Sequence, residues 1–410
     1  MSAFSLPARE GQRPVTLHID LVTVGLVASI VLLGLVMVTS ASVSLAAKES
    51  GEPLRYLLQQ FTLVIAGLFA AVFAFSIRTD WLDKWSTLLL LGAVVLLTLV
   101  LIPGIGYEVN GSRRWLRLGS FNFQASEAAR VMVLVFIASY AVRRETELRT
   151  SFMGLLKPLC IVALIGVLLL LEPDFGAAVV LATTAFGVLF IAGARWRDVI
   201  GLAIVGVGLI VVVAFSSEYR LRRLVAFRNP WEDPFDSGFQ LTQSLIAIGR
   251  GGWTGVGLGE SVQKLFYLPE AHTDFLFAVL AEELGLLGII VTLGLFLALA
   301  WRALYIARLA DQAGLKFPAY LAAGFGIWLS IQAFINIGVN MGALPTKGLT
   351  LPFMSYGRSS LAVTLGWVGI LLRVYHEAAL ASRGSAAASI RSAAAAHSSS
   401  HSRLAIEDSR

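Results

Sequence analysis

The chain has 410 residues, of which 57% are hydrophobic and only 14% are charged, and its formal net charge is +6. Because a soluble globular protein carries about 25% charged residues, this composition excludes an ordinary soluble domain. The apolar residues form continuous blocks of about 20 residues, the length that a helix needs to cross a hydrocarbon core, and they do not alternate as in a membrane barrel. The single cysteine, Cys160, excludes a disulfide framework and a cysteine metal cluster. We therefore expect an all-α, polytopic integral membrane protein.

The apolar blocks predict ten transmembrane helices. Their approximate ranges are 20–42, 57–76, 85–102, 125–142, 157–171, 176–193, 198–215, 272–300, 318–340 and 355–375. The fifth and sixth blocks are separated only by the tight turn Glu172-Pro173-Asp174-Phe175, since a proline cannot continue a helix. The block that begins at Leu21 is too long for the apolar core of a signal peptide and lacks a clear cleavage site. We expect it to remain as the first span.

Lysine and arginine in short loops predict the orientation, because cytoplasmic loops carry the excess of positive charge. With the N-terminus inside, most basic residues of short loops fall on the cytoplasmic face, and the other face has few outside 103–124 and 216–271. We expect 1–19 to be a cytoplasmic tail, 20–376 to be the membrane domain, and 216–271 to be a large extracytoplasmic loop between helices 7 and 8. Residues 377–410 have little bulky apolar content, which predicts a disordered cytoplasmic tail. An anionic ligand at the outer face would explain the basic residues there.

An unusual group of charged residues begins the eighth apolar block, where His272 and Asp274 precede Glu282 and Glu283. Charge at membrane depth is costly, so such residues are functional candidates. Asp274 at a helix start suits either a carboxylate favoured by the helix dipole or a general base that takes a proton from a hydroxyl. The two glutamates lie about 12 Å deeper, where pairing with arginine or backbone groups is the structural alternative. His272 is either a residue that orients a substrate or a surface residue near a helix start.

The outer segment 103–124 interleaves arginines with tryptophan at Arg113, Arg114 and Trp115. The planar guanidinium groups suit a diphosphate. The alternative is an anchor against lipid headgroups, with Trp115 in the interfacial belt. Both interpretations place these residues at the outer membrane surface.

A pair of opposite charges opens the fourth span. Glu127 and Arg130 open the fourth span at i and i+3, so they meet on one helix face. They are either a buried structural ion pair or substrate residues.

The glycine-rich segment, residues 249–259, contains a GxG pattern, but no strand precedes it and no G-K-[ST] follows, which excludes a nucleotide site. Flexible or closely packed backbone near a substrate is the simpler interpretation.

The loop between the last two spans, 344–360, is bracketed by prolines and rich in hydroxyl groups. It is either a re-entrant connector buried in protein or a second wall of an outer cavity. In the second case Lys347 and Arg358 add positive charge, and Ser355 and Ser359 offer hydroxyl groups to a substrate.

Four segments stand out together: Tyr219-Arg220-Leu221-Arg222-Arg223-Leu224, Asn229-Pro230-Trp231, Gly238-Phe239-Gln240, and Leu268 through Gly285. With them the sequence over about 20–375 resembles the SEDS (shape, elongation, division and sporulation) glycosyltransferases, the family of FtsW and RodA. Residues 229–235 and 255–268 look like the division branch, FtsW. The chain departs from the family pattern at Ala125 and Arg130, mildly, and at Arg358, where the family usually has glycine.

The resemblance implies ten transmembrane helices and the polymerisation of lipid II into glycan strands outside the cytoplasmic membrane of a bacterium. The essential acid of the family matches Asp274. Its Arg-Trp loop matches Arg113 to Trp115, and its ion pair in the fourth helix matches Glu127 and Arg130. The implied setting is the division septum, with a cognate class B penicillin-binding protein, other divisome membrane proteins and membrane lipid as partners, and no nucleic acid.

The expected reaction has Asp274 remove a proton from an acceptor hydroxyl of lipid II, whose oxygen attacks the anomeric carbon of the growing strand. Arg113, Arg220 and Arg222 are the candidates that stabilise the departing undecaprenyl diphosphate. A divalent cation, Mg²⁺ or Mn²⁺, could share this task, although no ligand cluster in the sequence demands a metal. The alternatives are a lipid II flippase and a scaffold that only positions the transpeptidase.

Overall fold

The computed structural model describes residues 4–5, 16–109, 112–118, 121–215, 227, 229–234, 238–345, 348–357 and 359–407. Its elements are β1 (Phe4–Ser5), β2 (Thr16–Leu17), α1 (Leu21–Ser50), α2 (Arg55–Ser76), α3 (Thr79–Lys84), α4 (Ser86–Leu101), β3 (Gly106–Val109), β4 (Ser112–Leu118), β5 (Phe121–Gln124), α5 (Ala125–Arg143), α6 (Glu145–Thr150), α7 (Phe152–Leu171), α8 (Phe175–Ile191), α9 (Trp196–Phe215), α11 (Phe239–Gly251), α12 (Leu276–Gln312), α13 (Lys316–Asn340) and α14 (Ser360–Glu407).

Six helices of the described chain are long and apolar enough to cross a membrane: α1, α2, α5, α7, α12 and α13. Helices α4 and α8 are apolar but shorter. The predicted class, a helical multi-pass membrane protein, is confirmed. The most apolar windows of α5 and α13 are each 72% buried, whereas that of α2 is 17% buried. Helices α5 and α13 therefore form the inside of the bundle, and α2 presents most of its apolar surface outward.

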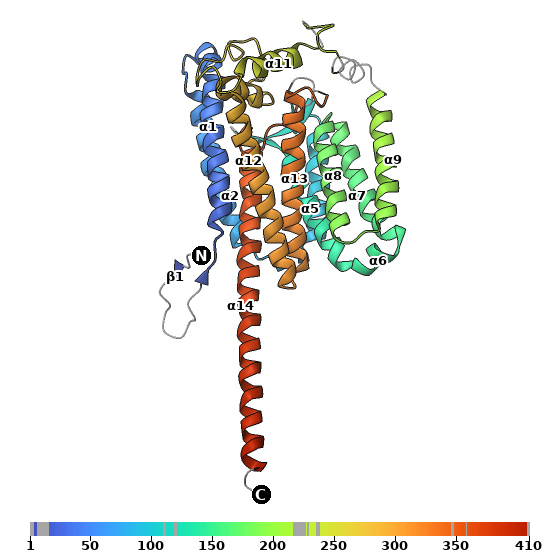
Figure 1. Ribbon diagram of the computed structural model, residues 1–410. Coiled ribbons are helices and arrows are strands. Elements are labelled where there is room, and N and C mark those ends of the chain that lie inside the picture. Colours follow the sequence, from blue (N-terminus) through green and yellow to red (C-terminus); the bar gives the residue numbers. More distant parts are fainter. Residues whose placement is uncertain are drawn as a thin grey trace.

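The helices run side by side, with α11 lying across one end of the bundle and α9 at its margin (Figure 1). Helix α14 packs along α2, and α13 packs against both α12 and α8. Beyond these contacts α14 continues out of the opposite end of the bundle (Figure 1). The end covered by α11 holds the loops that carry most of the sequence candidates.

The segment 103–124, expected as a loop, contains a three-stranded antiparallel sheet in the order β3-β4-β5. The sequence offered two signals for it: an Asn-Gly dipeptide at 110–111, typical of hairpin turns, and β-favouring aromatic residues on either side. The pairing of Trp115 with Gln124 brings β4 to the start of α5. This sheet gives the Arg-Trp segment a fixed position at the end of the bundle.

Helix α12 is broken at Gly285, where φ is +63°. The glycine-rich segment lies against this break: Val256 and Gly257 donate their backbone N–H groups to the carbonyl oxygens of Glu282 and Glu283, at 3.0 and 3.1 Å. A Cβ at Gly285 would lie 2.3 Å from the backbone nitrogen of Gly255, so only glycine fits. The prediction of closely packed backbone in this segment is confirmed. The contact fixes the first turns of α12, and with them the residues that precede it.

Helix α14 continues to Glu407, in a part of the chain where alanine, the strongest helix former, recurs. Outside the bundle a helix has little besides this propensity to stabilise it, and the disorder predicted for 377–410 stays a prediction. The eighth span begins later than predicted, at Leu276.

Candidate active site

A cavity of about 1250 Å³ lies at the end of the bundle that carries α11. Its walls come from α1, α2, β4, α11, the segment that leads into α12, and the loop between α13 and α14. The lining is chemically mixed, because apolar side chains such as Leu45, Phe266 and Leu268 stand beside charged ones. Such a lining suits an amphipathic ligand better than a purely apolar or purely ionic one.

Asp274 lines this cavity and is half-buried, two residues before α12 begins. Its backbone oxygen accepts hydrogen bonds from the side-chain amides of Asn336 and Asn340 on α13, at 2.9 and 3.1 Å. Asn336 also donates to the backbone oxygen of Leu349, at 2.5 Å. The two asparagines thus hold Asp274 and the opposite cavity wall in one network. That wall comes close at Gly348, where a Cβ would lie 3.0 Å from Asp274 Oδ2 and crowd it.

Neither asparagine was a candidate from the sequence. The available signal was their i, i+4 spacing inside an otherwise apolar span, which puts two polar amides on one helix face. Both are almost fully buried. A buried amide must find hydrogen-bond partners, so this spacing could have identified the pair as an anchor.

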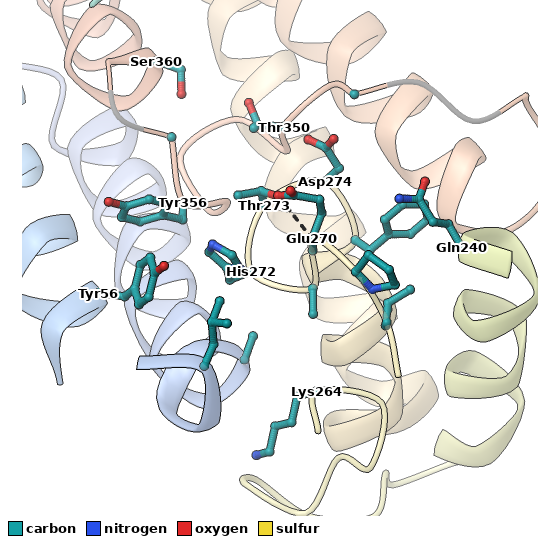
Figure 2. Close-up of a pocket in the computed structure, with 18 of the residues that line it drawn as sticks. Tyr56, Gln240, Lys264, Glu270, His272, Thr273, Asp274, Thr350, Tyr356 and Ser360 are labelled. Carbon is teal, nitrogen blue, oxygen red and sulfur yellow. Dashed lines mark hydrogen bonds between the residues drawn. The ribbon is translucent and has the colours of Figure 1, made fainter. Parts of the chain in front are cut away.

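His272 belongs to a cluster of three rings at one side of the cavity. Its ring centroid lies 4.9 Å from that of Tyr56 and 5.6 Å from that of Tyr356. Figure 2 shows the three rings together, with Asp274 and Thr350 to one side of them. All five residues line the cavity, so the structure places the predicted His272 where it can contact a ligand. Tyr56, at the start of α2, gave no such signal in the sequence.

The Arg-Trp segment divides between two environments. Arg114 and Trp115 line the cavity, but Arg113 does not. Arg113 instead forms an ion pair with Glu108 of β3, at 3.0 Å. The sequence predicted both arginines as substrate residues; the structure places Arg114 at the cavity, and the role of Arg113 in stabilising a diphosphate stays a prediction. The sequence could not distinguish the two, because the facing of a strand residue depends on register, and β3 has a shift at Tyr107.

Arg114 is held by backbone oxygens rather than by a carboxylate. Its Nε donates to the oxygen of Glu172 at 3.0 Å, and its Nη2 donates to the oxygen of Pro173 at 2.6 Å. Neutral acceptors fix the guanidinium without cancelling its charge. Arg114 is thus a pre-oriented cation at the cavity wall, which suits the oxyanions of a phosphate group.

The turn behind Arg114 contains two carboxyl groups with opposite surroundings. Asp174 accepts hydrogen bonds from Gln124, Ser126 and the backbone N–H of Ala177. Glu172 is completely buried, and neither of its carboxyl oxygens has a hydrogen-bond partner in the described chain. Burial and, after it, the charge of Asp174 raise the pKa of the Glu172 carboxyl to about 8, against a smaller opposite effect of Arg114.

Both deep glutamates of α12 are fully buried and paired, in agreement with the structural interpretation. Glu282 accepts hydrogen bonds from Ser261 and from the backbone N–H of Val262. Glu283 accepts from Lys264 Nζ at 3.0 Å, and Lys264 also lines the cavity. These bonds tie the segment that leads into α12 to the helix itself, so they position the cavity wall.

The remaining candidates lie near the cavity but do not line it. Ser355 accepts a hydrogen bond from the backbone N–H of Leu351, and Ser359 accepts one from that of Gln124; both hydroxyls are buried. They stabilise the walls, whereas Thr350 and Ser360 present hydroxyl groups to the cavity.

Glu127 and Arg130 form a buried ion pair, as the structural interpretation predicted. Arg130 also donates to Gln332 of α13 at 2.9 Å, and Gln332 donates to the backbone oxygen of Thr350 at 3.1 Å. The pair therefore supports the cavity wall from behind. Three predicted residues, Arg220, Arg222 and Lys347, lie outside the described residues, and so does Arg358.

In the described part of the chain, no three His, Cys, Asp or Glu side chains form a group that could hold a metal ion. Mg²⁺ is usually bound by one or two carboxylates together with substrate phosphates. Asp274 and Glu270 both line the cavity, and they are the carboxylates that would hold a cation arriving with a phosphate-bearing ligand.

Comparison with known proteins agrees with this architecture. A family model described as "Cell cycle protein", that of FtsW, RodA and SpoVE, matches residues 20–380. The chain is similar to a solved chain described as "Structural coordination of polymerization and crosslinking by a peptidoglycan synthase complex", with a TM-score of 0.71, 30% identity, and coverage of 88% of this chain and 99% of that one. It is also similar to the rod shape determining protein RodA of Thermus thermophilus, with a TM-score of 0.65, 30% identity, and coverage of 88% and 97%. The chain belongs to this family of helical membrane proteins.

Its similarity to individual relatives narrows the family to one branch. A probable peptidoglycan glycosyltransferase FtsW from Thioalkalivibrio sulfidiphilus is 55% identical, over 84% of this chain and 86% of that protein. One from Hahella chejuensis is 50% identical, over 92% and 95%. The chain is thus a member of the FtsW branch of the SEDS family, and the resemblance seen in the sequence is confirmed.

Proposed function

We propose that this protein is a peptidoglycan glycosyltransferase that polymerises lipid II into glycan strands for septal cell-wall synthesis during cell division. The observation that carries the proposal is the cavity that brings Asp274 and Arg114 together at one end of a membrane bundle. The relatives of the FtsW branch are named for the same activity. In this proposal the chain crosses the cytoplasmic membrane ten times, has both termini in the cytoplasm, and opens its cavity on the outer side.

The substrate explains the mixed lining of the cavity. Lipid II joins an apolar polyprenyl tail to an anionic diphosphate and a polar disaccharide-pentapeptide. A ligand of this kind needs apolar wall, a cation and hydrogen-bonding groups within one site. Phe266, Arg114 and Gln240 supply one of each among the lining residues.

Asp274 is the proposed general base. Its carboxylate accepts the proton of the acceptor hydroxyl on lipid II, and the oxygen attacks the anomeric carbon of the strand. The bond from that carbon to the diphosphate oxygen breaks, and undecaprenyl diphosphate leaves with the bonding electron pair. Positioned bases of this kind contribute about 10²- to 10⁴-fold to a rate. The anchoring of Asp274 by two asparagines supports the assignment, because a base acts only from a fixed position.

Arg114 is the proposed stabiliser of the leaving diphosphate, and Arg113 stays a proposal for the same role. A fixed guanidinium stabilises the developing charge without reorganising during the reaction. Arg220, Arg222 and Lys347 remain proposals for further contacts to the ligand. A Mg²⁺ or Mn²⁺ ion held by Asp274 or Glu270 would add charge neutralisation at the diphosphate. Treatment with EDTA should then lower the polymerisation rate, and added Mg²⁺ should restore it.

The proposed partner is a class B penicillin-binding protein that crosslinks the new strands, within a larger set of divisome membrane proteins. The support is the similarity to a chain from a complex that is described as coordinating polymerization and crosslinking. Membrane lipid surrounds the bundle in this proposal, and nucleic acid has no part in it.

Reconstitution tests the function. The full chain and its transpeptidase are placed in proteoliposomes with lipid II, and glycan strands are resolved on gels. Asp274→Asn keeps the shape of the side chain and should lower the rate at least 100-fold. Glu260→Gln, an exposed carboxyl of the same outer segment that does not line the cavity, is the matched control and should keep the wild-type rate. Full activity of Asp274→Asn would show that Asp274 is not the base.

The same preparation separates the alternatives. A flippase would move labelled lipid II across the bilayer without making polymer, and a scaffold would do neither. Many-helix bundles with buried charges also occur in transporters, so the transbilayer assay is run in parallel. If the wild type forms polymer and Asp274→Asn does not, the protein is a transferase. Neither flippase activity nor a scaffold role alone would explain that result.

A further inference from the structure

Glu172 is a buried acid for which the proposed reaction has no use. It is completely buried, and both carboxyl oxygens lack a hydrogen-bond donor among the described residues. An ionised carboxylate in such a place would be a buried charge without a hydrogen-bond donor in the described chain, which is unfavourable. The geometry by itself therefore favours the neutral acid.

The neighbouring Asp174 shows the contrast within the same turn. Three donors surround its carboxylate: the side chains of Gln124 and Ser126 and the backbone N–H of Ala177. The carboxyl group of Glu172, two residues away, has no such donor among the described residues. The turn thus supplies hydrogen bonds to one of its two carboxyl groups and leaves the other without them in the described chain.

Arg114 of β4 is the other charged group that acts on Glu172. It is tied to the turn through the backbone oxygens of Glu172 and Pro173. Its charge is not paired with a carboxylate at ion-pair distance in the described chain, in contrast to Arg113 with Glu108. Arg114 lines the cavity, and its guanidinium also contacts Glu172 through the backbone oxygen of that residue.

We propose that Glu172 and Arg114 form one anion-binding unit, in which a protonated Glu172 leaves the positive charge of Arg114 available to a phosphate group in the cavity. When Glu172 ionises, its negative charge offsets that of Arg114, and a phosphate-bearing ligand binds less tightly. Glu172 is a positioning residue in this scheme, because it acts on the ligand only through Arg114. The inference rests on the proposed function, which assigns a diphosphate to this site. The raised pKa of Glu172, about 8, puts the change just above neutral pH.

The binding of geranyl diphosphate to the purified full chain tests this unit between pH 7.5 and 9.5. Since the second pKa of a phosphate monoester is about 6, the probe keeps its charge over the whole range. The dissociation constant of the wild type should rise about tenfold across it, because Glu172 ionises within this range and a single ionisation changes affinity by at most tenfold for each pH unit above the pKa. Glu172→Gln should bind with the wild-type affinity of pH 7.5 and keep it at pH 9.5. Glu172→Met, a second uncharged variant, should give the same flat profile if the glutamine variant does not fold.

Two controls separate this inference from the proposed function. Glu52→Gln removes an exposed carboxyl that does not line the cavity, and its pH profile should match that of the wild type. Arg114→Gln should weaken binding at every pH. If the wild type and Glu172→Gln lose affinity in parallel, the inference about Glu172 is wrong while the diphosphate site stands. If Arg114→Gln binds as the wild type does, the diphosphate site itself is wrong, and the unit with it. The binding assay needs no polymerisation, so its outcome is independent of whether the chain makes glycan.

Discussion

Asn336 and Asn340 share one acceptor, the backbone oxygen of Asp274, and this sharing can be measured. Each amide donates to that oxygen, and Asn336 has a second acceptor in the backbone oxygen of Leu349. Replacing one asparagine by alanine still leaves Asp274 with the other donor. Only the double variant, Asn336→Ala with Asn340→Ala, removes both.

The expected magnitudes follow from this arrangement. Each single replacement loses hydrogen bonds, with a net contribution to stability of about 0.5–1.5 kcal/mol per bond. Asn336→Ala also leaves the buried oxygen of Leu349 without that donor. The double variant should be destabilised by up to about 1–3 kcal/mol more than the sum of the two single variants, because only it removes both asparagine donors from one part-buried oxygen. Because the same bonds position Asp274, the polymerisation rate should fall more than the product of the single effects.

The assay combines denaturant unfolding of the four proteins in detergent with their rates in proteoliposomes. Ser330→Ala on the same helix is the control: Ser330 is exposed, and its hydroxyl donates to the backbone oxygen of Gly326, at 2.7 Å. Its free energy of unfolding should stay within about 0.5 kcal/mol of the wild type. Additive effects in the double variant would refute the shared anchor, and a normal rate in a destabilised double variant would refute its role in placing Asp274.

Three further outcomes follow from the structure. Gly285→Ala puts a Cβ 2.3 Å from a backbone nitrogen of the glycine-rich segment, at a φ of +63°, and should abolish the yield of monodisperse protein. Gly294→Ala, with open space around it, should keep that yield. Equal yields of the two variants would contradict the role of the kink. Lys264→Met leaves the buried Glu283 without its ammonium partner and should lower the free energy of unfolding by about 3–5 kcal/mol. Adding Glu283→Gln should recover part of that loss. If it recovers nothing, the ion pair does not stabilise the fold. For Glu172 the folded protein keeps its proton between pH 4.5 and about 8 while the unfolded chain releases it. The free energy of unfolding should therefore fall as pH rises through this window, and Glu172→Gln should lack that part of the slope in denaturant titrations.

The helices were largely predictable because their signal is local. The predicted spans 125–142 and 318–340 agree closely with α5 (Ala125–Arg143) and α13 (Lys316–Asn340). Composition over about 20 residues decides whether a segment can enter a membrane. The sheet at 106–124 was not predicted, because its arginines and aromatic residues were taken as part of a loop and the Asn-Gly turn signal was not used.

The chemistry of the site was predictable from the sequence, but the set of residues that line the cavity was not. Asp274 and Arg114 line the cavity as proposed, and Ser355 does not. Lys264 and Tyr56 join the lining from segments far apart in the sequence. Which of several neighbouring polar residues faces a cavity depends on strand register, turn geometry and helix rotation, and none of these can be deduced from residue type.

The sequence alone determined that this is a helical membrane protein with costly charges at the start of its eighth apolar block, because hydrophobic length and the penalty for buried charge are local properties. The tertiary structure decided which arginine lines the cavity, whether Glu172 or Asp174 has hydrogen-bond donors among the described residues, and which asparagines hold the segment of Asp274. Those outcomes depend on contacts between β4, the turn before α8, and α13, and such contacts exist only once the bundle is assembled.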